Sequence, residues 1–307
     1  MRQAMNGTMP HITQYQGSKR ILAPQILPYM PLRFRRLVEP FAGMAAITIA
    51  AAQQHRARLY HVNDINAPLV EILREAIENP EGLSRQYAEV WSEQFAHPEG
   101  SVAHFYKVRQ DFNQGNASAG NLLYLIARCV KGAVRYGGDG HFNQSPDKRR
   151  HGTHPKTLAK NLFAISALLK DRTTFSSEDY RQVLRHVGKG DLVYMDPPYQ
   201  GVSNTRDNRY LSGIPFDEFA EAIDRLNASG ADFLISYDGT CGEKTYGQDL
   251  PPCLGVKKVM LNAGLSSQGL LLGKKVVTHE ALYISKGLQG LFPQPAPQLQ
   301  LFHQAKA

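Results

Sequence analysis

Cysteine is scarce in this chain of 307 residues, and the spacing of the few cysteines does not suit disulfide bonds or metal binding. There are three, at positions 129, 241 and 253, which is an odd number. None belongs to a Cys-x-x-Cys pair or lies near a pair of histidines, so a disulfide framework and a zinc site are both disfavoured. We expect a protein of a reducing cytoplasm that holds no metal.

Long apolar runs are also missing. No stretch approaches the roughly 18–20 apolar residues of a membrane span, and no signal peptide opens the sequence. No internal repeat is visible. Hydrophobic residues nevertheless make up 42% of the chain, enough to bury a sizeable core. We therefore expect a soluble, intracellular protein.

Positive charge is present in excess. The chain has 35 Lys and Arg against 27 Asp and Glu, a net charge of +8 and a pI near 9.3. A basic surplus suits a protein that meets a phosphate backbone, because each neutralised phosphate releases counterions. Charge alone fits equally well with a basic enzyme that has no nucleic-acid partner.

Strand and helix patterns alternate along most of the chain. The apolar spacing predicts strands at 36–38, 59–63, 191–195, 232–236, 257–261 and 279–285, and helices at 44–52, 69–77, 158–169 and 216–227. Such alternation implies right-handed crossovers and a mainly parallel sheet. The sequence therefore predicts an α/β fold.

The middle of the chain has a different texture. Aromatic residues in a helical background lead into a glycine-rich, basic run at 131–143, which predicts a hairpin or loop. Lys148, Arg149 and Arg150 follow, either to contact phosphates or as a solvated basic loop. The predicted units are a discontinuous catalytic domain of residues 1–79 and 156–290, a mainly helical insertion of residues 80–155, and an extended, proline-rich tail of residues 291–307.

The sharpest motif is Asp196-Pro197-Pro198-Tyr199, directly after a predicted strand. Two prolines cannot continue a central ladder, so the chain must leave the sheet at Asp196, at the edge where α/β sheets bind ligands. The motif supplies a carboxylate, a stiff backbone and an aromatic ring. Asp196 and the Pro197 carbonyl can accept the two N–H groups of an exocyclic amine, and Tyr199 can stack on its base.

These groups suit methylation of such an amine. The amine is conjugated with its ring and is a poor nucleophile, and two acceptors favour a more tetrahedral nitrogen whose lone pair faces a methyl donor. They matter most where positive charge develops. The Pro-Cys nucleophile that cytosine-5 methylation would use is not visible. A tight turn that merely ends a strand is the competing interpretation.

Two further motifs lie nearer the N-terminus. Gly43, in Glu39-Pro40-Phe41-Ala42-Gly43, sits in a strand-to-helix turn that lets backbone approach a ligand, and Asp64 follows 21 residues later, where an acid would accept ribose hydroxyls. Tyr15-Gln16-Gly17-Ser18-Lys19 offers a ring, a turn and a cation that could meet the carboxylate of an amino-acid-bearing cofactor. An ordinary turn with a surface acid, and a solvated lysine, are the alternatives.

The order of these blocks resembles the DNA adenine methyltransferase (Dam) family, over roughly residues 12–285. The resemblance also runs through Asn63-Asp64-Ile65-Asn66, through residues 105–113 and through the run from Gly132 to Asn143. It implies a Rossmann-like, S-adenosylmethionine-dependent methyltransferase sheet with a helical target-recognition insertion. The implied reaction is transfer of a methyl group to the N6 amine of an adenine flipped out of double-stranded DNA.

Residue by residue, the resemblance implies three groups of functional side chains. The cofactor would be held by Tyr15, Lys19, Phe41, Gly43, Asp64, Ile65 and Asp196, with Asp179 or Tyr180 beside its adenine. The flipped base would be held by Asp196, Pro197 and Tyr199. The DNA would be contacted by Lys131, Arg135, Tyr136, Lys148, Arg149 and Arg150, with Arg135 reading a base, since its fork suits the major-groove edge of guanine.

The chain departs from the family pattern at several positions. Ala45 stands where a second glycine is usual. In the recognition hairpin, the usual Asn-Gly-Leu is Lys131-Gly132-Ala133, and the usual Val-Pro-Phe-Gly is the tetrapeptide 144–147. Since these hairpin positions lie beside the bases in the resembling proteins, the target need not be GATC.

The tail contains a short glutamine-leucine-phenylalanine motif, Gln298-Leu299-Gln300-Leu301-Phe302. It resembles the peptide by which bacterial replication proteins dock on the sliding clamp, where spaced apolar side chains fill a groove. A disordered tail with three stray apolar residues is the alternative. We expect a cytoplasmic enzyme, associated with the nucleoid through DNA.

Other substrates and one other class of function stay open. The amine could be cytosine N4 in DNA, adenine N6 in RNA or a glutamine side chain, although the aspartate at 196 and the order of the blocks favour adenine in DNA. A catalytically silent DNA-binding module with the same fold is the alternative from a different class. Whether the enzyme is paired with a restriction nuclease, and its oligomeric state, are not revealed by the sequence.

Overall fold

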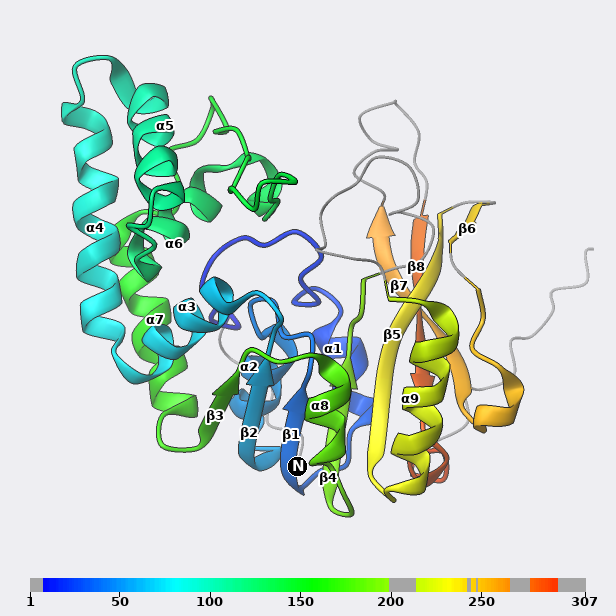
Figure 1. The fold of residues 1–307 in the computed structure, drawn as a ribbon. Helices are drawn as coiled ribbons and strands as arrows, with labels where there is room; N and C mark the ends of the chain where they lie inside the picture. The colour runs from blue at the N-terminus through cyan, green and yellow to red at the C-terminus, as the bar shows by residue number, and fades with distance from the viewer. Residues whose placement is uncertain (1–7, 199–213, 242–243, 247, 266–276, 292–307) are drawn as a thin grey trace, which may run out of the picture.

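A single twisted sheet forms the centre of the molecule (Figure 1). The structure is a computed structural model that describes residues 8–198, 214–241, 244–246, 248–265 and 277–291. The described strands are β1 (Phe34–Glu39), β2 (Ala57–Asn63), β3 (Thr173–Ser176), β4 (Asp191–Met195), β5 (Asp232–Cys241), β6 (Lys244–Tyr246), β7 (Lys257–Leu265) and β8 (Val277–Ile284). Their order is β3-β2-β1-β4-β5-β8-β7, with β6 paired to β5.

The sheet is parallel except at one end. The pairs β1–β2, β1–β4, β2–β3 and β4–β5 are parallel, whereas β8 is antiparallel to both β5 and β7. The expected α/β fold with a mainly parallel sheet is confirmed. The chain runs outward from β1 to β2 and later returns to the other side of β1 as β4, so the strand order reverses between β1 and β4. Ligands bind at such a switch point, beyond the carboxyl ends of the strands.

Helices cover both faces of the sheet (Figure 1). One face carries α1 (Ala23–Ile26), α2 (Ala46–Gln53), α3 (Ala67–Glu78) and α7 (Pro155–Leu169), and the other carries α8 (Tyr180–Arg185) and α9 (Phe216–Ala228). Alternate residues of a strand point to opposite faces. Accordingly, Leu192 and Tyr194 of β4 join one apolar core, and Val193 and Met195 join the other. All of β4 is buried, as expected for a central strand.

The insertion consists of α4 (Pro80–Ala96), α5 (Gly100–Asn113) and α6 (Ala119–Arg128), followed by a long loop. Helix α4 packs on α6 and α7, and the apolar core of the insertion is continuous with that of α2, α3 and α7. The predicted division at residues 79/80 and 155/156 stays a prediction. No helix within the described ranges is long and apolar enough to cross a membrane.

The loop after α6 contains the expected hairpin in a narrow form. Isolated antiparallel bridges join Tyr136 to Phe142 and Cys129 to Pro146. The buried side chain of Arg128 donates to the carbonyl oxygens of Asp147, at 2.7 Å, and Arg150. Hydrogen bonds from one buried guanidinium therefore order a loop that has little regular structure of its own.

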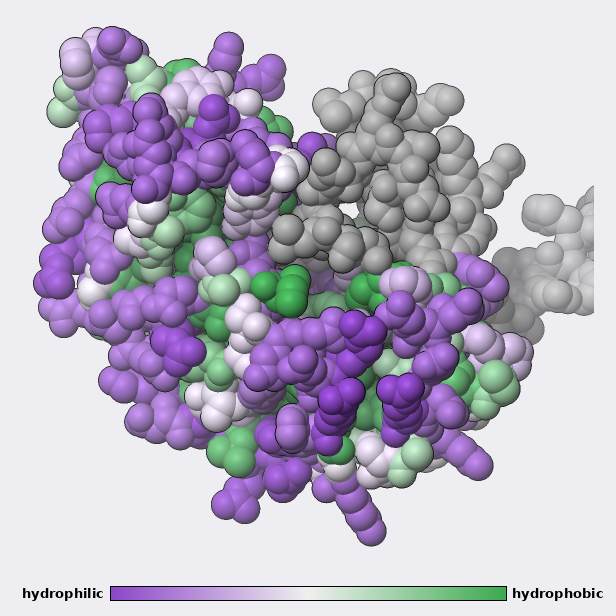
Figure 2. Space-filling view, in the orientation of Figure 1, coloured by the Kyte–Doolittle hydropathy of each residue, from purple (hydrophilic) through white to green (hydrophobic). Residues whose placement is uncertain are grey.

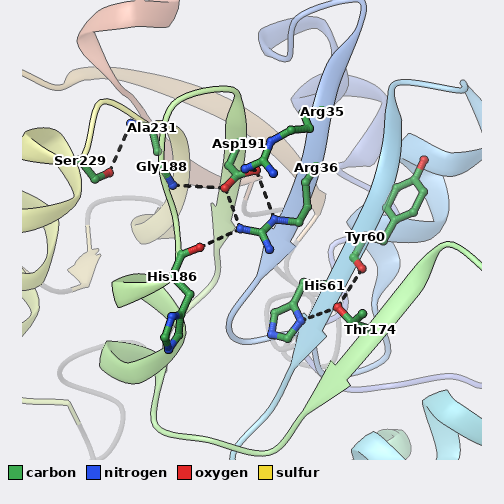
Figure 3. Close-up of polar contacts among 10 residues, drawn as sticks. All are labelled: Arg35, Arg36, Tyr60, His61, Thr174, His186, Gly188, Asp191, Ser229 and Ala231. Carbon is green, nitrogen blue, oxygen red and sulfur yellow. Dashed lines mark hydrogen bonds and ion pairs between the residues drawn. The ribbon is translucent and has the colours of Figure 1, made fainter.

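At the opposite edge of the sheet, the amino ends of β1 and β4 are joined by a charged network (Figure 3). The buried carboxylate of Asp191 accepts from Arg35 at 2.7 Å, from Arg36 at 2.7 and 3.2 Å, and from the Gly188 amide at 3.2 Å. Arg36 also donates to the His186 carbonyl at 2.8 Å. Paired in this way, the buried charge holds β1 and β4 in register.

Candidate active site

A cavity of about 210 Å³ opens at the carboxyl ends of β1, β2 and β4. Figure 2 shows hydrophobic residues gathered in the recess between the helical insertion and the sheet, on a face that is otherwise largely hydrophilic. The cavity is lined by all nine residues that the sequence assigned to the cofactor: Tyr15, Lys19, Phe41, Gly43, Asp64, Ile65, Asp179, Tyr180 and Asp196. The fold thus brings together side chains that are up to 181 positions apart, from 15 to 196.

The turn after β1 depends on glycine at position 43. Gly43 has φ +50°, and a Cβ atom there would lie 3.0 Å from Cε1 of Tyr15. Ala45, two residues on, also adopts a left-handed conformation, with φ 51°. A left-handed conformation costs an L-residue roughly 1–2 kcal/mol, so this turn keeps its shape at the expense of some backbone strain where the family usually has a second glycine.

Asp64 ties two of the turns together. One carboxylate oxygen accepts the Gly43 amide at 2.9 Å, and the other accepts the Asn66 amide at 3.0 Å. Burial raises the pKa of Asp64, and the two amides act against that shift. Each oxygen keeps a lone pair, so Asp64 can brace the turns and still accept a ligand hydroxyl, the role expected for it.

Asn63, the last residue of β2, is a structural residue that the sequence included in a motif without assigning it a role. Its amide group donates to the carbonyls of Pro40 and Glu178, both at 2.9 Å. Its oxygen accepts from the Ser176 hydroxyl at 2.7 Å and the Glu178 amide at 2.8 Å. One buried, fully bonded amide therefore joins the ends of β1, β2 and β3 below the cavity. An asparagine inside a buried strand was the available signal.

Glu39, the last residue of β1, is buried beneath the cavity. One of its oxygens accepts from the Thr48 hydroxyl at 2.6 Å and the Thr48 amide at 3.1 Å. Burial raises its pKa to about 8, and the nearby carboxylates of Asp196 and Asp64 contribute to the shift. Glu39 is therefore protonated at neutral pH. The sequence included it in a motif but assigned it no role.

The carboxylate of Asp196 meets a cation at the end of β4. Lys19 Nζ lies 2.9 Å from Oδ1 of Asp196 and 3.1 Å from Oε2 of Glu280, and the lysine side chain is 5% exposed. Burial raises the pKa of Asp196 to about 6; Lys19 opposes this shift and Glu280 adds to it. The structure places the Lys19 ammonium between two protein carboxylates at the cavity, and its expected contact with a cofactor carboxylate stays a prediction. Glu280, on β8, was not predicted.

Two further residues, Pro197 and Tyr199, were expected to hold the base, and the structure describes only the first of them. Pro197 is buried directly after Asp196, and the next residue, Pro198, lines the cavity. Tyr199 lies outside the described residues.

An aromatic wall borders the cavity beside α8. The rings of Phe41 and Tyr180 lie 5.1 Å apart at 36°. Asp179 caps α8 by accepting the Arg181 amide at 2.9 Å, and it pairs with the Arg181 side chain at 2.8 Å. Aromatic faces of this kind suit a planar ring. Both residues that the sequence placed near the adenine of the cofactor are thus at the cavity, but the Asp179 carboxylate is already engaged.

The expected DNA contacts fall into two sets. Lys131, Lys148 and Arg149 are exposed, and Arg135 is half-buried. The remaining two, Tyr136 and Arg150, are drawn toward the cavity and the N-terminal segment.

The hydroxyl of Tyr136 is 3.2 Å from the side chain of Asn66 at the cavity rim. Arg150 pairs with Asp147 at 2.8 Å and donates to Gln14 Oε1 at 2.8 Å. Both therefore link the insertion to the site. Arg150 is at the same time exposed, and contact of either residue with DNA stays a prediction.

The comparisons with known proteins identify the family. Residues 15–251 match the model of the D12 class N6 adenine-specific DNA methyltransferases. The chain belongs to this family. The resemblance noted from the sequence, the methyltransferase fold and the assignment as an adenine-specific DNA methyltransferase are confirmed.

Three relatives illustrate the match. The chain is 27% identical over 243 residues to the retron Ec67 DNA adenine methylase of Escherichia coli, covering 76% of this chain and 78% of that protein. It is 28% identical over 239 residues to a DNA N-6-adenine-methyltransferase of Escherichia phage P1, covering 74% of this chain but 30% of the phage protein. Identity to the DNA adenine methylase of Serratia marcescens is 25% over 195 residues, covering 62% and 67%.

Proposed function

We propose that the cavity binds S-adenosylmethionine and that Asp196 receives the amine of a flipped adenine beside it. The observation that carries the proposal is the position of Asp196, at the switch point between β1 and β4, in the same cavity as Gly43 and Asp64. The glycine turn, the ribose-accepting acid and the amine-accepting acid then serve one reaction. The proposal therefore assigns the motifs around Gly43, Asp64 and Asp196 to one methyl-transfer reaction.

The residues present fit this cofactor. Gly43 leaves room for backbone to approach a ligand under the Tyr15 ring, Asp64 keeps lone pairs for hydroxyls, and the Phe41–Tyr180 pair offers faces for a purine. When bound, S-adenosylmethionine supplies a methyl group on a positively charged sulfur.

Asp196 and the Pro197 carbonyl would orient the substrate amine. Two acceptors take its two N–H groups and direct the nitrogen lone pair into the cavity. Asp196 acts as acceptor in its ionised form, which predominates above its pKa of about 6. Stacking of the base on Tyr199 stays a prediction, since that residue lies outside the described ranges.

The target base must leave the duplex for this contact to form, because its amine cannot reach the cavity from inside the helix. Lys131, Lys148 and Arg149 are exposed on the loop of the insertion and are available for phosphates. Arg135 is placed on the hairpin of the same loop, where it would read a base edge.

Expression in cells that lack adenine methylation tests the function. Single-molecule sequencing of their DNA should find N6-methyladenine within one discrete motif, which would also give the recognition sequence. Unmodified DNA from cells that contain soluble, cofactor-binding protein would contradict the proposal and direct the search to cytosine N4, RNA or a protein amide.

A variant at Asp196 tests the mechanism. We predict that Asp196→Ala binds cofactor and DNA but loses methyl transfer by at least about 10²-fold, since an acceptor aimed at developing charge is removed. Transfer of tritiated methyl groups to DNA measures the loss. Asp224→Ala, on the exposed face of α9, is the control and should match wild type. Wild-type rates in the Asp196 variant would contradict the assigned role.

Clamp docking is a separate proposal. The segment Gln298–Phe302 lies outside the described residues, and its likeness to the clamp-docking peptide is the support. A tail peptide should bind the clamp saturably and compete with a known clamp ligand. Absence of binding, with the known ligand active, would remove the proposal. A cytoplasmic, DNA-associated location is likewise proposed from the substrate.

A further inference from the structure

Three charged side chains from distant parts of the chain meet at the end of β4. Lys19 precedes α1, Asp196 follows β4, and Glu280 lies on β8. The lysine ammonium is 2.9 Å from one carboxylate and 3.1 Å from the other, and all three side chains are at most 22% exposed. An arrangement of two carboxylates around one buried cation carries one net negative charge when all three are ionised.

We infer that Glu280 is a positioning residue for methyl transfer, which holds Lys19 and keeps the charge around Asp196 net negative. The inference rests on the proposed function, in which Asp196 receives the substrate amine. Without Glu280, Lys19 and Asp196 would form a neutral pair. Glu280 acts through Lys19 rather than by touching the base.

A net negative charge at this position would favour methyl transfer to the amine. The amine nitrogen forms a bond to the methyl carbon while the carbon–sulfur bond breaks, and the electron pair of that bond stays on sulfur. The nitrogen becomes positively charged and then releases a proton to water. A fixed negative charge near the nitrogen stabilises this cation, and it does so most strongly where the site is shielded from water. A neutral Lys–Asp pair would stabilise it far less.

Two further ionisable groups near Asp196, within the part of the chain that the structure describes, are uncharged near neutral pH. Glu39, on β1, has its pKa raised to about 8 by burial. Tyr194, on β4, has a pKa well above its usual value, and its hydroxyl is 2.7 Å from the Ser236 hydroxyl. Lys19 and Glu280 are therefore the charged side chains whose effect on Asp196 the structure describes, and they act on its pKa in opposite directions.

The sheet is built to bring Glu280 to this place. Opposite β8, strand β5 carries an extra residue between Tyr237 and Gly239, and Gly239 pairs with Glu280. A Cβ atom at Gly239 would lie 2.6 Å from the His279 carbonyl oxygen, so a glycine is needed for the strands to approach. Bulges of this kind redirect side chains near active sites. The irregularity occurs beside the residue that reaches Lys19.

The free protein provides the first test. Glu280→Gln keeps the size of the side chain and removes the charge. Carboxyl carbon NMR, with the Asp196 signal assigned by Asp196→Asn, should show a lower Asp196 pKa in the Glu280 variant, because a like charge is gone. Asp249→Asn, which removes a carboxylate in the connection between β6 and β7, 2.6 Å from Lys258, should leave the Asp196 pKa unchanged. An unchanged or higher Asp196 pKa in Glu280→Gln would overturn the inference.

The second test compares the kinetics of DNA methylation by the Glu280 variants with those of the wild-type enzyme. In Glu280→Gln, we expect kcat at saturating DNA and cofactor to fall on the order of tenfold, less than for loss of a direct acceptor. The acid limb of the pH profile, near 6 in wild type, should move to lower pH. Glu280→Asp should recover part of the rate. A fall in kcat that merely follows a loss of cofactor binding or melting temperature would indicate a structural role and overturn the inference.

A double-mutant cycle separates action through Lys19 from an independent effect. The losses in kcat caused by Lys19→Gln and Glu280→Gln should not be additive in the double variant, because the two residues act as a unit. Additive losses would overturn the route through Lys19. A wild-type enzyme that methylates DNA while the Glu280 variants behave as wild type would refute this inference alone, whereas an inactive wild type would refute the proposed function.

Discussion

At the scale of single residues, the site is built from carboxylates with different protonation states. Asp196 has a pKa near 6 and is ionised at neutral pH, whereas Glu39 has a pKa near 8 and is protonated. Glu39 is buried and Asp196 is partly buried, and they differ because Asp196 has the Lys19 ammonium at 2.9 Å while Glu39 accepts from the neutral groups of Thr48. One fold thus holds an acceptor and a neutral acid side by side.

We predict that Glu39 makes the stability of the folded protein depend on pH. Its pKa is raised in the folded state, so its contribution is fully present below about 4.5, and it is lost as the pH rises toward 8. The loss is at most about 1.4 kcal/mol per pH unit. Glu39→Gln retains an acceptor for Thr48 without a titrating group. Melting temperatures of the two proteins should diverge between about pH 4.5 and pH 8, with wild type falling further, and the difference should stay constant above pH 8.

The comparison with the variant isolates Glu39 from other titrations, because all other groups are common to both proteins. Parallel melting curves across the whole pH range would contradict a raised pKa at this position.

At the scale of elements, the N-terminal segment is held against the loop of the insertion. The Gln16 amide donates to the Gly132 carbonyl at 3.1 Å, and Arg150 donates to the Gln14 side chain. Gly132 has φ +62°, and a Cβ atom there would lie 2.1 Å from the Gln14 carbonyl oxygen. The segment that carries Tyr15 and reaches Lys19 is therefore packed directly on the loop that follows α6.

We predict that Gly132→Ala displaces this segment. The strain and overlap should lower the free energy of unfolding by about 1–3 kcal/mol and weaken cofactor binding, because Tyr15 lies over Gly43 in the cavity. Calorimetry with S-adenosylmethionine measures the affinity. Gly138→Ala is the matched control in the same loop, since a Cβ there meets nothing within 4 Å. Equal affinities for both variants would show that the contact does not support the cavity.

Elements with strong local signals could be predicted from sequence. Strand β4 has the expected limits, Asp191–Met195, because a continuous apolar run ends at two prolines. Strand β3 and helix α8 were not predicted, since they are four and six residues long and β3 has no buried residue. Short elements at a sheet edge are fixed by tertiary contacts, such as the Asn63 amide on Ser176, that local patterns do not contain.

The candidate site, like the fold, was predicted from sequence only where its residues form continuous motifs. Motifs continuous in sequence, such as Glu39–Gly43 and Asp196–Pro198, identified the lining of the cavity. The partner of Lys19 could not be predicted, because Glu280 comes from an antiparallel strand whose register depends on an irregularity in β5. The roles of Tyr136 and Arg150 also depend on how the loop folds back on the cavity.

At the scale of the whole molecule, the net charge of +8 favours association with DNA. We predict that Lys148→Ala with Arg149→Ala weakens DNA binding and reduces the slope of log K against log salt by about two, one unit for each phosphate contact. Fluorescence anisotropy at several salt concentrations measures it. Lys189→Ala, exposed at the opposite edge of the sheet, should leave the slope unchanged. A slope equal to wild type in the double variant would remove both residues from the interface.

The order of the last strands has a consequence for how the protein is made on the ribosome. β8 is the last strand described along the chain, yet it lies between β5 and β7, and β7 pairs with β8 alone among the described strands. While β8 is still inside the exit tunnel, β7 has no place in the sheet and the main edge of β5 is uncovered. During that interval the nascent chain presents an open strand to chaperones or to neighbouring chains, and Lys19 and Asp196 have not yet met Glu280. Emergence of β8 from the tunnel therefore places β7 in the sheet and brings Glu280 to Lys19 in one event.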